Sequence, residues 1–241
     1  MGIPSARSIK VFATWQSVVA EEVEGKAVVV VDTLRATTTL NTMLANGATA
    51  VIPVAGLAQA RALKREIPEA ILAGERNNLP PPDFDGGNSP LEYPKDRVAG
   101  RPVVLSTTNG TQAVERCRGS RAMAAGAIIN AAAIAKWVAG TGLDAVIVLS
   151  GSEGRLALED WLAGGAILDG LSTLDWSDEA QAAHLAWMSA RADVAEALLR
   201  AAHGARLAAE GMAADVRYAA ELDRIQAVAV RDPDGWFRFL S

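Results

Sequence analysis

The chain has 241 residues, half of them hydrophobic, which is enough to bury a large core and argues against disorder. Its formal net charge of −5 and the lack of any Lys/Arg block argue against nucleic acid and the membrane surface as partners. A single cysteine, Cys117, excludes a disulfide framework and a thiolate metal cage, and it suits a reducing cytosol.

The beginning of the chain does not resemble a secretory signal. Residues 1–10 are polar and lack an apolar run ahead of a small-residue cleavage site. The Ala-rich stretches elsewhere stay well below the ~18 consecutive apolar residues of a membrane-spanning helix. We therefore expect a soluble, cytoplasmic protein.

Strand-like and helix-like segments alternate over residues 1–150. Apolar, β-branched runs indicate strands, and Gly or Pro ends several of the helices between them. This alternation is typical of stacked βαβ units and a mostly parallel sheet. The predicted strands are 9–14, 27–31, 50–54, 70–73, 102–105, 122–125 and 144–149, and the predicted helices are 38–46, 56–66, 130–138 and a segment that starts near 110.

Residues 151–241 differ in composition from the first part of the chain. Between 155 and 218 they are dense in Ala and Leu, which predicts an almost entirely helical layer. A hairpin with strands at 225–230 and 236–239 is expected to follow. The predicted fold is α/β, with a three-layer α/β/α core in 1–150 and a helix-rich part in 151–241 within one compact unit. The apolar helical layer also suggests a homodimer.

The segment 77–94 interrupts the alternation. Three consecutive prolines and a Gly-Gly pair exclude regular structure there, and so long a loop in a compact domain is usually functional or disordered. Its paired acids favour function, because an oxygen-rich loop can supply ligands for a hard cation. The oxygen-bearing side chains are those of Asp83, Asp85, Asn88, Ser89 and Glu92.

The most informative stretch is the apolar run 28–31 and the polar turn that follows it. Asp32 and Arg35 fall where the carboxyl end of this strand meets a helix, the edge at which open α/β sheets bind ligands. Thr37 and Thr38 could cap the helix and offer hydroxyls beside its free N–H groups, which favours an anion. The simpler alternative is a capped helix with a surface ion pair.

Two further strands end in polar turns of the same kind, at 106–111 and 150–155. In a parallel sheet all three turns lie on one edge, so their hydroxyls, backbone N–H groups and arginines can converge. Three such turns favour an oxyanion site, with Thr108, Asn109 and Gly110 as candidates for binding phosphate.

The spacing of key residues excludes the common phosphate chemistries. Met123 stands where a tyrosine-phosphatase-like loop beginning at Cys117 needs its arginine, and Leu34 stands where a phosphoaspartyl pair needs its second acid. No Gly-Lys-Ser/Thr follows a glycine-rich turn, so a P-loop is excluded. The two histidines, His184 and His203, are expected to lie on helix surfaces without a catalytic role.

Carboxylates and arginines remain as the carriers of chemistry. Together they suggest a magnesium-assisted reaction, because Mg²⁺ takes one or two carboxylates and bridges to substrate phosphate. Arginine adds bidentate hydrogen bonds to phosphate or carboxylate oxygens. Most acids of any protein are simply solvated. The candidates are Asp32, Glu75, Asp85, Glu153, Glu159, Asp160 and Asp223 among the acids, and Arg35, Arg76 and Arg155 among the arginines.

The motifs at 32–37, 74–76, 85–90, 107–111, 153–155, 158–160, 203–204 and 222–224 together resemble those of the 2-phosphosulfolactate phosphatases. The resemblance runs in order over nearly the whole chain. It implies an α/β fold peculiar to the family and a Mg²⁺-dependent phosphatase. The implied reaction converts 2-phospho-3-sulfolactate to sulfolactate and phosphate, on the way to coenzyme M, and other 2-hydroxycarboxylic acid phosphates stay open as substrates.

On this basis we hypothesise a role for each candidate residue. The competing hypothesis is a non-catalytic binder or sensor of a small phosphorylated or sulfonated acid, but carboxylates weaken a pure anion receptor unless a metal intervenes. The hypothetical roles are metal binding by Asp32, Glu75 and Asp160; catalysis by Asp32, Arg35, Glu159 and Asp160; phosphate binding by Thr37, Thr38, Thr108, Asn109 and Gly110; and substrate binding by Arg76, Asn88, Ser89 and Arg155.

Overall fold

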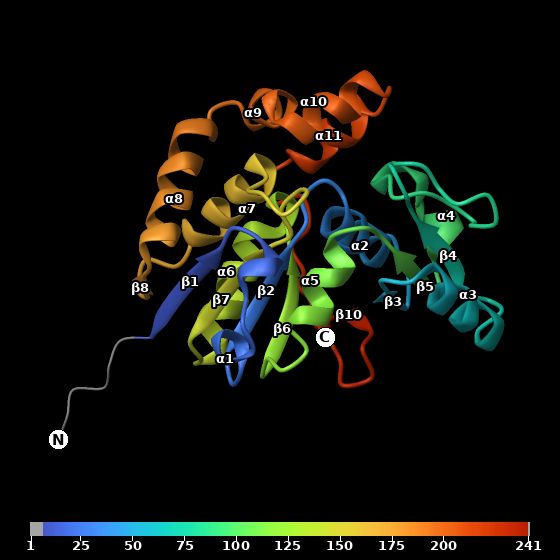
Figure 1. Ribbon diagram of the computed structural model, residues 1–241, viewed down its shortest axis with the longest axis horizontal. Helices are drawn as coiled ribbons and strands as arrows, with labels where there is room; N and C mark the ends of the chain where they lie inside the picture. The colour runs from blue at the N-terminus through green and yellow to red at the C-terminus, as the bar shows by residue number, and fades with distance from the viewer. Residues whose placement is uncertain (1–6, 241) are drawn as a thin grey trace.

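The computed structural model of the chain describes residues 7–240, so the prediction for the start of the chain lies mostly outside the described residues. Its strands form one ten-stranded sheet in the order β4-β5-β3-β10-β9-β6-β2-β7-β1-β8 (Figure 1). The strands are β1 Ser8–Phe12, β2 Ala27–Val31, β3 Ala50–Pro53, β4 Ile71–Gly74, β5 Pro102–Ser106, β6 Ala122–Gly126, β7 Ala145–Leu149, β8 Asp175–Trp176, β9 Ala229–Arg231 and β10 Phe237–Phe239.

The sheet consists of two parallel groups joined by an antiparallel hairpin. Strands β3, β4 and β5 form the small group, and β1, β2, β6, β7 and β8 form the large group. The predicted C-terminal hairpin is present as β9 and β10, and it pairs antiparallel with β6 on one side and β3 on the other. The predicted α/β class with a mostly parallel sheet is therefore confirmed.

Helices connect the strands and cover the sheet, and five of them lie between 158 and 219, where the Ala/Leu-rich composition predicted an almost entirely helical layer; the two-residue strand β8 separates the first of the five from the rest. No described helix is both long and apolar enough to cross a membrane. The homodimer stays a prediction. The helices are α1 Ala20–Val23, α2 Ala36–Ala45, α3 Leu57–Glu66, α4 Lys95–Val98, α5 Gly110–Arg116, α6 Ala131–Thr141, α7 Leu158–Leu168, α8 Asp178–Ala190, α9 Val194–Arg200, α10 Ala202–Ala209 and α11 Ala213–Ala219, with short 3-10 turns at Trp15–Ser17, Pro90–Glu92 and Ile128–Asn130.

Strand β2 is buried on both faces, as its unalternated run of valines predicted. Val29 packs in a core with Ile134 of α6, together with residues of α7 and α8. Val28 faces a second core that contains Leu40 of α2 and continues to Val103 of β5. Figure 1 shows α2 and α5 between the large and small groups of strands. Each of these helices contacts strands of both groups, α2 contacting β6 and β3, and α5 contacting β2 and β3.

The polar turns that follow β2 and β5 meet, although not for the reason that the sequence suggested. Three antiparallel pairings separate the two groups, so their strands run in opposite directions and the turns do not share one edge of a parallel sheet. Instead the turn after β5 packs directly against the turn after β2. A Cβ atom at Gly110 would lie 2.7 Å from Asp32 Oδ2, so only glycine allows this close approach.

The segment 77–94 contains no regular element longer than one 3-10 turn, as its prolines predicted. Its carboxylates hold the loop in place. Asp83 pairs with Arg61 at 2.7 Å, Asp85 accepts a backbone N–H of β4 at 2.8 Å, and Glu92 accepts a backbone N–H of the loop itself at 2.8 Å. These contacts favour a structural role for the three acids over the cation-binding role that the sequence suggested.

Candidate active site

A cavity of about 340 Å³ opens where the ends of the strands meet α10. Residues from all three predicted polar turns line it, together with the loop after β4 and three side chains of α10 and its C-terminal end. Of the candidate residues, the cavity is lined by Asp32, Arg35, Glu75, Asn88, Thr108, Asn109 and Glu153.

Asp32 lies at the carboxyl end of β2 and is only 7% exposed. Its Oδ1 accepts the backbone N–H of Ala36 at 3.1 Å, at the start of α2. Burial is the main cause that raises the pKa of Asp32 to about 6; the Ala36 N–H and the charge of His203 oppose this rise, while Glu75 and Glu159 add to it. Asp32 is therefore a buried carboxylate among other carboxylates, an arrangement that a bound cation would stabilise.

Glu75, directly after β4, connects two parts of the cavity wall. Its Oε1 accepts both the backbone N–H and the hydroxyl of Thr108 at 2.9 Å, and its Oε2 accepts the backbone N–H of Asn78 at 3.1 Å. Glu75 thus fixes the turn after β5 against the loop after β4. The polar hydrogens of Thr108 point to Glu75, so a phosphate would have to compete for them.

Asp160 holds two of the polar turns together from the first turn of α7. Its Oδ1 accepts the backbone N–H of Thr33 at 2.7 Å, and its Oδ2 accepts that of Gly151 at 3.0 Å. Burial raises its pKa well above the usual value, and the charges of Asp32 and Glu159 add to this rise. Asp160 is not among the residues that line the cavity, which distinguishes it from Glu75, whose two oxygens also accept hydrogen bonds from the protein.

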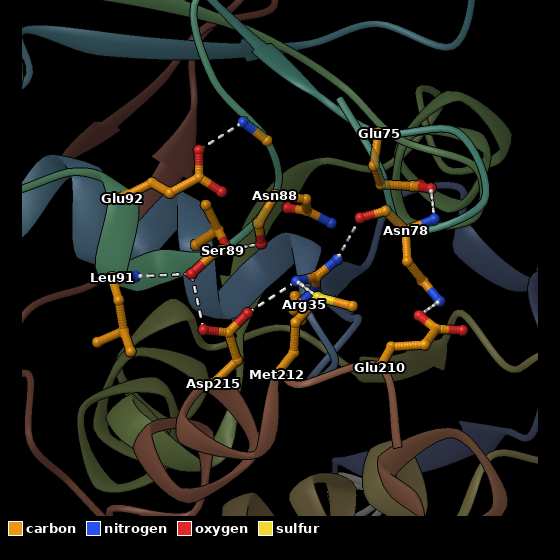
Figure 2. Close-up of polar contacts among 12 residues, drawn as sticks. Arg35, Glu75, Asn78, Asn88, Ser89, Leu91, Glu92, Glu210, Met212 and Asp215 are labelled. Atoms are coloured by element: carbon orange, nitrogen blue, oxygen red, sulfur yellow. Dashed lines mark hydrogen bonds and ion pairs between the residues drawn. The ribbon is translucent and has the colours of Figure 1, made fainter. Parts of the chain in front are cut away.

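Arg35 is buried and paired, so the simpler alternative of a surface ion pair is wrong. Its Nη1 lies 2.7 Å from Asp215 Oδ2, and its Nη2 donates to the carbonyl oxygen of Asn78 at 3.2 Å (Figure 2). Ser89 donates its hydroxyl to the other oxygen of Asp215 at 2.7 Å. Asp215, on α11, is a residue that the sequence did not single out, and it balances the charge of Arg35.

The hydroxyls of Thr37 and Thr38 do not line the cavity. Thr37 exchanges hydrogen bonds with the backbone of Asp32, at 2.9 and 3.0 Å, and Thr38 donates to the carbonyl oxygen of Thr33 at 2.8 Å. These bonds close the turn into α2. The structure therefore corrects the prediction that both threonines face a phosphate.

The two arginines predicted to bind substrate have different surroundings. Arg76 donates to the carbonyl oxygens of Ala55 at 2.8 Å and Ser106 at 3.2 Å, and it does not line the cavity, so the structure assigns it to the backbone instead of the substrate. Arg155 is exposed and lines a second cavity of about 420 Å³. Four residues line both cavities, so they adjoin each other; these are Ser152, Glu153, His203 and Arg206.

Asn88 and Ser89, both predicted to bind substrate, also have different surroundings. Asn88 is 4% exposed and lines the first cavity, and its side-chain oxygen has no hydrogen-bond partner among the described residues. Ser89 does not line the cavity and supports it through Asp215. A buried amide oxygen without a partner usually indicates a missing donor such as a water, and the N–H groups of the same amide can donate to a substrate, so Asn88 fits a role in binding substrate.

Sequence reasoning missed the residues of α10. His203 lines both cavities, with Nδ1 3.4 Å from Glu159 Oε1, so the expectation of a helix-surface histidine is wrong for this residue. Arg206 lies one turn further along α10 and lines both cavities as well. The signal available in the sequence was the pair His203-Gly204, which fitted the resemblance but lies inside a long helical run.

An α/β fold with buried carboxylates at the strand ends, and with a histidine and an arginine opposite them, defines an enzyme for small anionic substrates. The cavities are of a size for such ligands. Comparison with known proteins agrees with this class and narrows it. A family model described as 2-phosphosulpholactate phosphatase matches residues 12–233.

Several similar proteins carry the same description. A "Probable 2-phosphosulfolactate phosphatase" of Carboxydothermus hydrogenoformans is 40% identical over 206 residues, which cover 85% of this chain and 86% of that protein. One of Thermotoga petrophila is 39% identical over 86% of this chain and 89% of its own length, and one of Deinococcus radiodurans is 38% identical over 88% and 92%.

The chain belongs to the 2-phosphosulpholactate phosphatase family and is a phosphoric monoester hydrolase. This membership confirms the resemblance seen in the sequence. It also favours hydrolysis over the competing hypothesis of a non-catalytic binder or sensor.

Proposed function

We propose that this protein hydrolyses 2-phospho-3-sulfolactate to 3-sulfolactate and phosphate, and that other 2-hydroxycarboxylic acid phosphates are candidate substrates of the same site. The observation that carries the proposal is the distribution of charge in the two adjoining cavities. Asp32 and Glu75 line the first cavity, where a cation can receive the phosphoryl group. Three arginines, Arg155, Arg200 and Arg206, line the second beside Glu153 and Glu159, and they can bind the acid groups of the substrate. The names of the relatives support the same reaction.

The carboxylates of the first cavity suit a magnesium ion. Asp32 and Glu75 both line the cavity, and each offers the hard oxygen atoms that Mg²⁺ prefers. The described residues form no group of three or more His, Cys, Asp or Glu side chains that could hold a metal ion. The proposal therefore relies on two carboxylates, and Mg²⁺ can bind through one or two while it keeps several waters. We propose Asp32 and Glu75 as the ligands, with Asp160 holding the turns around them. Bound Mg²⁺ would supply positive charge against the phosphoryl oxygens.

The polar groups beside these carboxylates can orient the phosphoryl group. Asn109 lines the cavity at the start of α5, and Asn88 presents an amide whose oxygen has no partner among the described residues. An amide offers both donors and an acceptor, so it can hold a phosphate oxygen or the substrate carboxylate. Gly110 lets this part of the wall approach Asp32.

The acid groups of the substrate are proposed to bind at the second cavity. Arg155 and Arg206 line it, and Arg206 also reaches the first cavity. Guanidinium groups match carboxylate and sulfonate oxygens through paired hydrogen bonds. We propose Arg206 here in place of Arg76, because the guanidinium of Arg76 is bound to backbone carbonyls.

Phosphate release tests the proposal. The purified protein is incubated with 2-phospho-3-sulfolactate or 2-phospholactate, with EDTA, and with EDTA followed by excess Mg²⁺. We expect turnover that EDTA abolishes and Mg²⁺ restores, and little release from glucose 6-phosphate, which lacks the 2-phospho acid group. Absence of metal-dependent turnover on every 2-phospho acid, together with tight binding of sulfolactate, would contradict the proposal.

A further inference from the structure

His203 occupies the place where the two cavities meet. Its side chain is 15% exposed, and its Nε2 atom is buried without a hydrogen-bond partner among the described residues. Buried polar atoms are rarely left unpaired, and for a residue that lines two ligand cavities a group on the ligand can supply the missing partner. None of the roles proposed for the other residues of the site involves this nitrogen.

The position of the ring is fixed at two points. On one side, Nδ1 lies 3.4 Å from Oε1 of Glu159, whose side chain is 3% exposed. On the other, the next residue, Gly204, packs so closely on the end of α9 that a Cβ atom there would collide with the carbonyl oxygen of Leu198. The start of α10 is thereby held against α9, and the ring is directed toward the cavities.

We propose that His203 is the general acid of the reaction and protonates the ester oxygen that leaves phosphorus. This inference rests on the proposed phosphatase function. The bond between phosphorus and the oxygen on C2 breaks, its electron pair stays on that oxygen, and the proton moves there from Nε2. The product is the 2-hydroxy acid. In the net reaction a water oxygen becomes bound to phosphorus, and a proton from that water returns to the ring.

The chemistry of the substrate calls for such a donor. A secondary alkoxide is a poor leaving group, and a positioned acid typically accelerates its departure by about 10²–10⁴-fold. Among the described residues that line the cavities there is no Lys, Tyr or Cys, and arginine does not release its proton in proteins. Of the carboxyl groups, Asp32 and Glu75 are proposed to hold the metal, and Glu159 is paired with the ring itself. Glu159 can stabilise the protonated ring and keep a proton on Nδ1, as carboxylates do for catalytic histidines elsewhere.

The test compares leaving groups in the full-length protein with His203→Asn. With 2-phospholactate, whose leaving group is an alkoxide, we expect kcat to fall by about 10²-fold or more, and with acetyl phosphate or p-nitrophenyl phosphate, whose leaving groups are stable anions, by less than about tenfold. Glu159→Gln should show the same pattern with a smaller loss. His184→Asn is the matched control, because that histidine lies on α8, pairs with Asp169 at the C-terminal end of α7 and lines neither cavity, and the variant should keep full activity.

The outcomes separate this inference from the proposed function. Absence of turnover by the wild-type protein on any ester overturns the phosphatase function and the inference with it. Suppose instead that the wild type is active, and that circular dichroism shows the His203→Asn variant to be folded. If this variant then loses equal activity on both classes of ester, only the role of His203 is overturned. If the wild type hydrolyses neither activated ester, added imidazole is tested on His203→Ala with 2-phospholactate: restored turnover supports the role, and no restoration overturns it.

Discussion

The two sides of the active-site cavity differ in both charge and origin. The strand-end wall, formed by Asp32, Glu75, Thr108 and Asn109, comes from the turns after β2, β4 and β5 and carries the carboxylates. The helical wall, formed by His203, Arg206 and Glu210, comes from α10 and its C-terminal end and carries the histidine and an arginine beside one carboxylate. A site for an anionic ester needs both walls, because the carboxylates alone repel the substrate.

The helical wall is fastened to the strand-end wall by polar contacts near the cavity. Glu210 accepts a hydrogen bond from the Asn78 side chain at 2.8 Å, and Asp215 binds both Arg35 and Ser89 (Figure 2). The strand-end wall is held within itself by bonds to backbone N–H groups. Changes to the strand-end wall should therefore lower kcat. Changes to the contacts between the two walls should lower the free energy of unfolding.

The largest effect is expected from Asp32→Asn in the strand-end wall. Loss of this carboxylate removes a proposed metal ligand beside the phosphoryl group, so kcat should fall by about 10³-fold or more while the protein stays folded. Phosphate release at saturating substrate measures the effect, and circular dichroism checks the fold. Asp83→Asn, at an exposed pair with Arg61 that lines neither cavity, should keep full activity. An active Asp32→Asn variant would remove Asp32 from the mechanism.

A large loss of stability is expected from Asp215→Ala at the junction of the walls. The change leaves the Arg35 guanidinium buried without its partner, which should lower the free energy of unfolding by about 3–5 kcal/mol. Urea unfolding measures it. Glu196→Ala, which breaks an exposed pair with Arg200 on α9, should cost no more than about 1 kcal/mol. A double change to Arg35→Met and Asp215→Leu should recover most of the stability, since apolar replacements of buried pairs often do so.

The smallest of these effects is expected from Arg206→Ala in the helical wall. Its side chain is 49% exposed, so stability should hardly change, but loss of a charge-assisted hydrogen bond to the substrate should raise KM by about tenfold or more. Initial rates over a range of 2-phospholactate concentrations measure this. Arg118→Ala, at a surface pair with Glu115, is the control. A fall in kcat with an unchanged KM would place Arg206 in the chemistry instead of in substrate binding.

Local patterns were sufficient to predict every described strand except β8, which lies in the segment predicted to be almost entirely helical, and most of the helices. The valines of β2 predicted the strand bounds 27–31 that the structure has, because burial on both faces selects an unbroken apolar run. The opposite directions of the two parallel groups could not be predicted in this way. They depend on how β9 and β10 pair with β6 and β3, which are distant in sequence and carry no local signal of register.

In the site too, residues marked by a local pattern could be predicted, and residues whose position depends on distant packing could not. Asp32 and Glu75 were found because each directly follows an apolar strand, a position that indicates a ligand-binding edge. Thr37 was misjudged because a hydroxyl at the start of a helix can bond either to a ligand or to the backbone, and here it bonds to Asp32. His203 and Asp215 lie in Ala-rich helices, where nothing in the local sequence tells which face meets the cavity.

The hairpin β9–β10 has a consequence for how the protein is made. It follows every other described strand in the chain, yet it lies in the middle of the sheet between β3 and β6. During synthesis both parallel groups emerge from the ribosome before the hairpin, and until it pairs, β3 and β6 each expose an open strand edge. Unpaired edges attract strands of other chains, so a nascent chain that stalls before residue 229 is at risk of aggregation at two places.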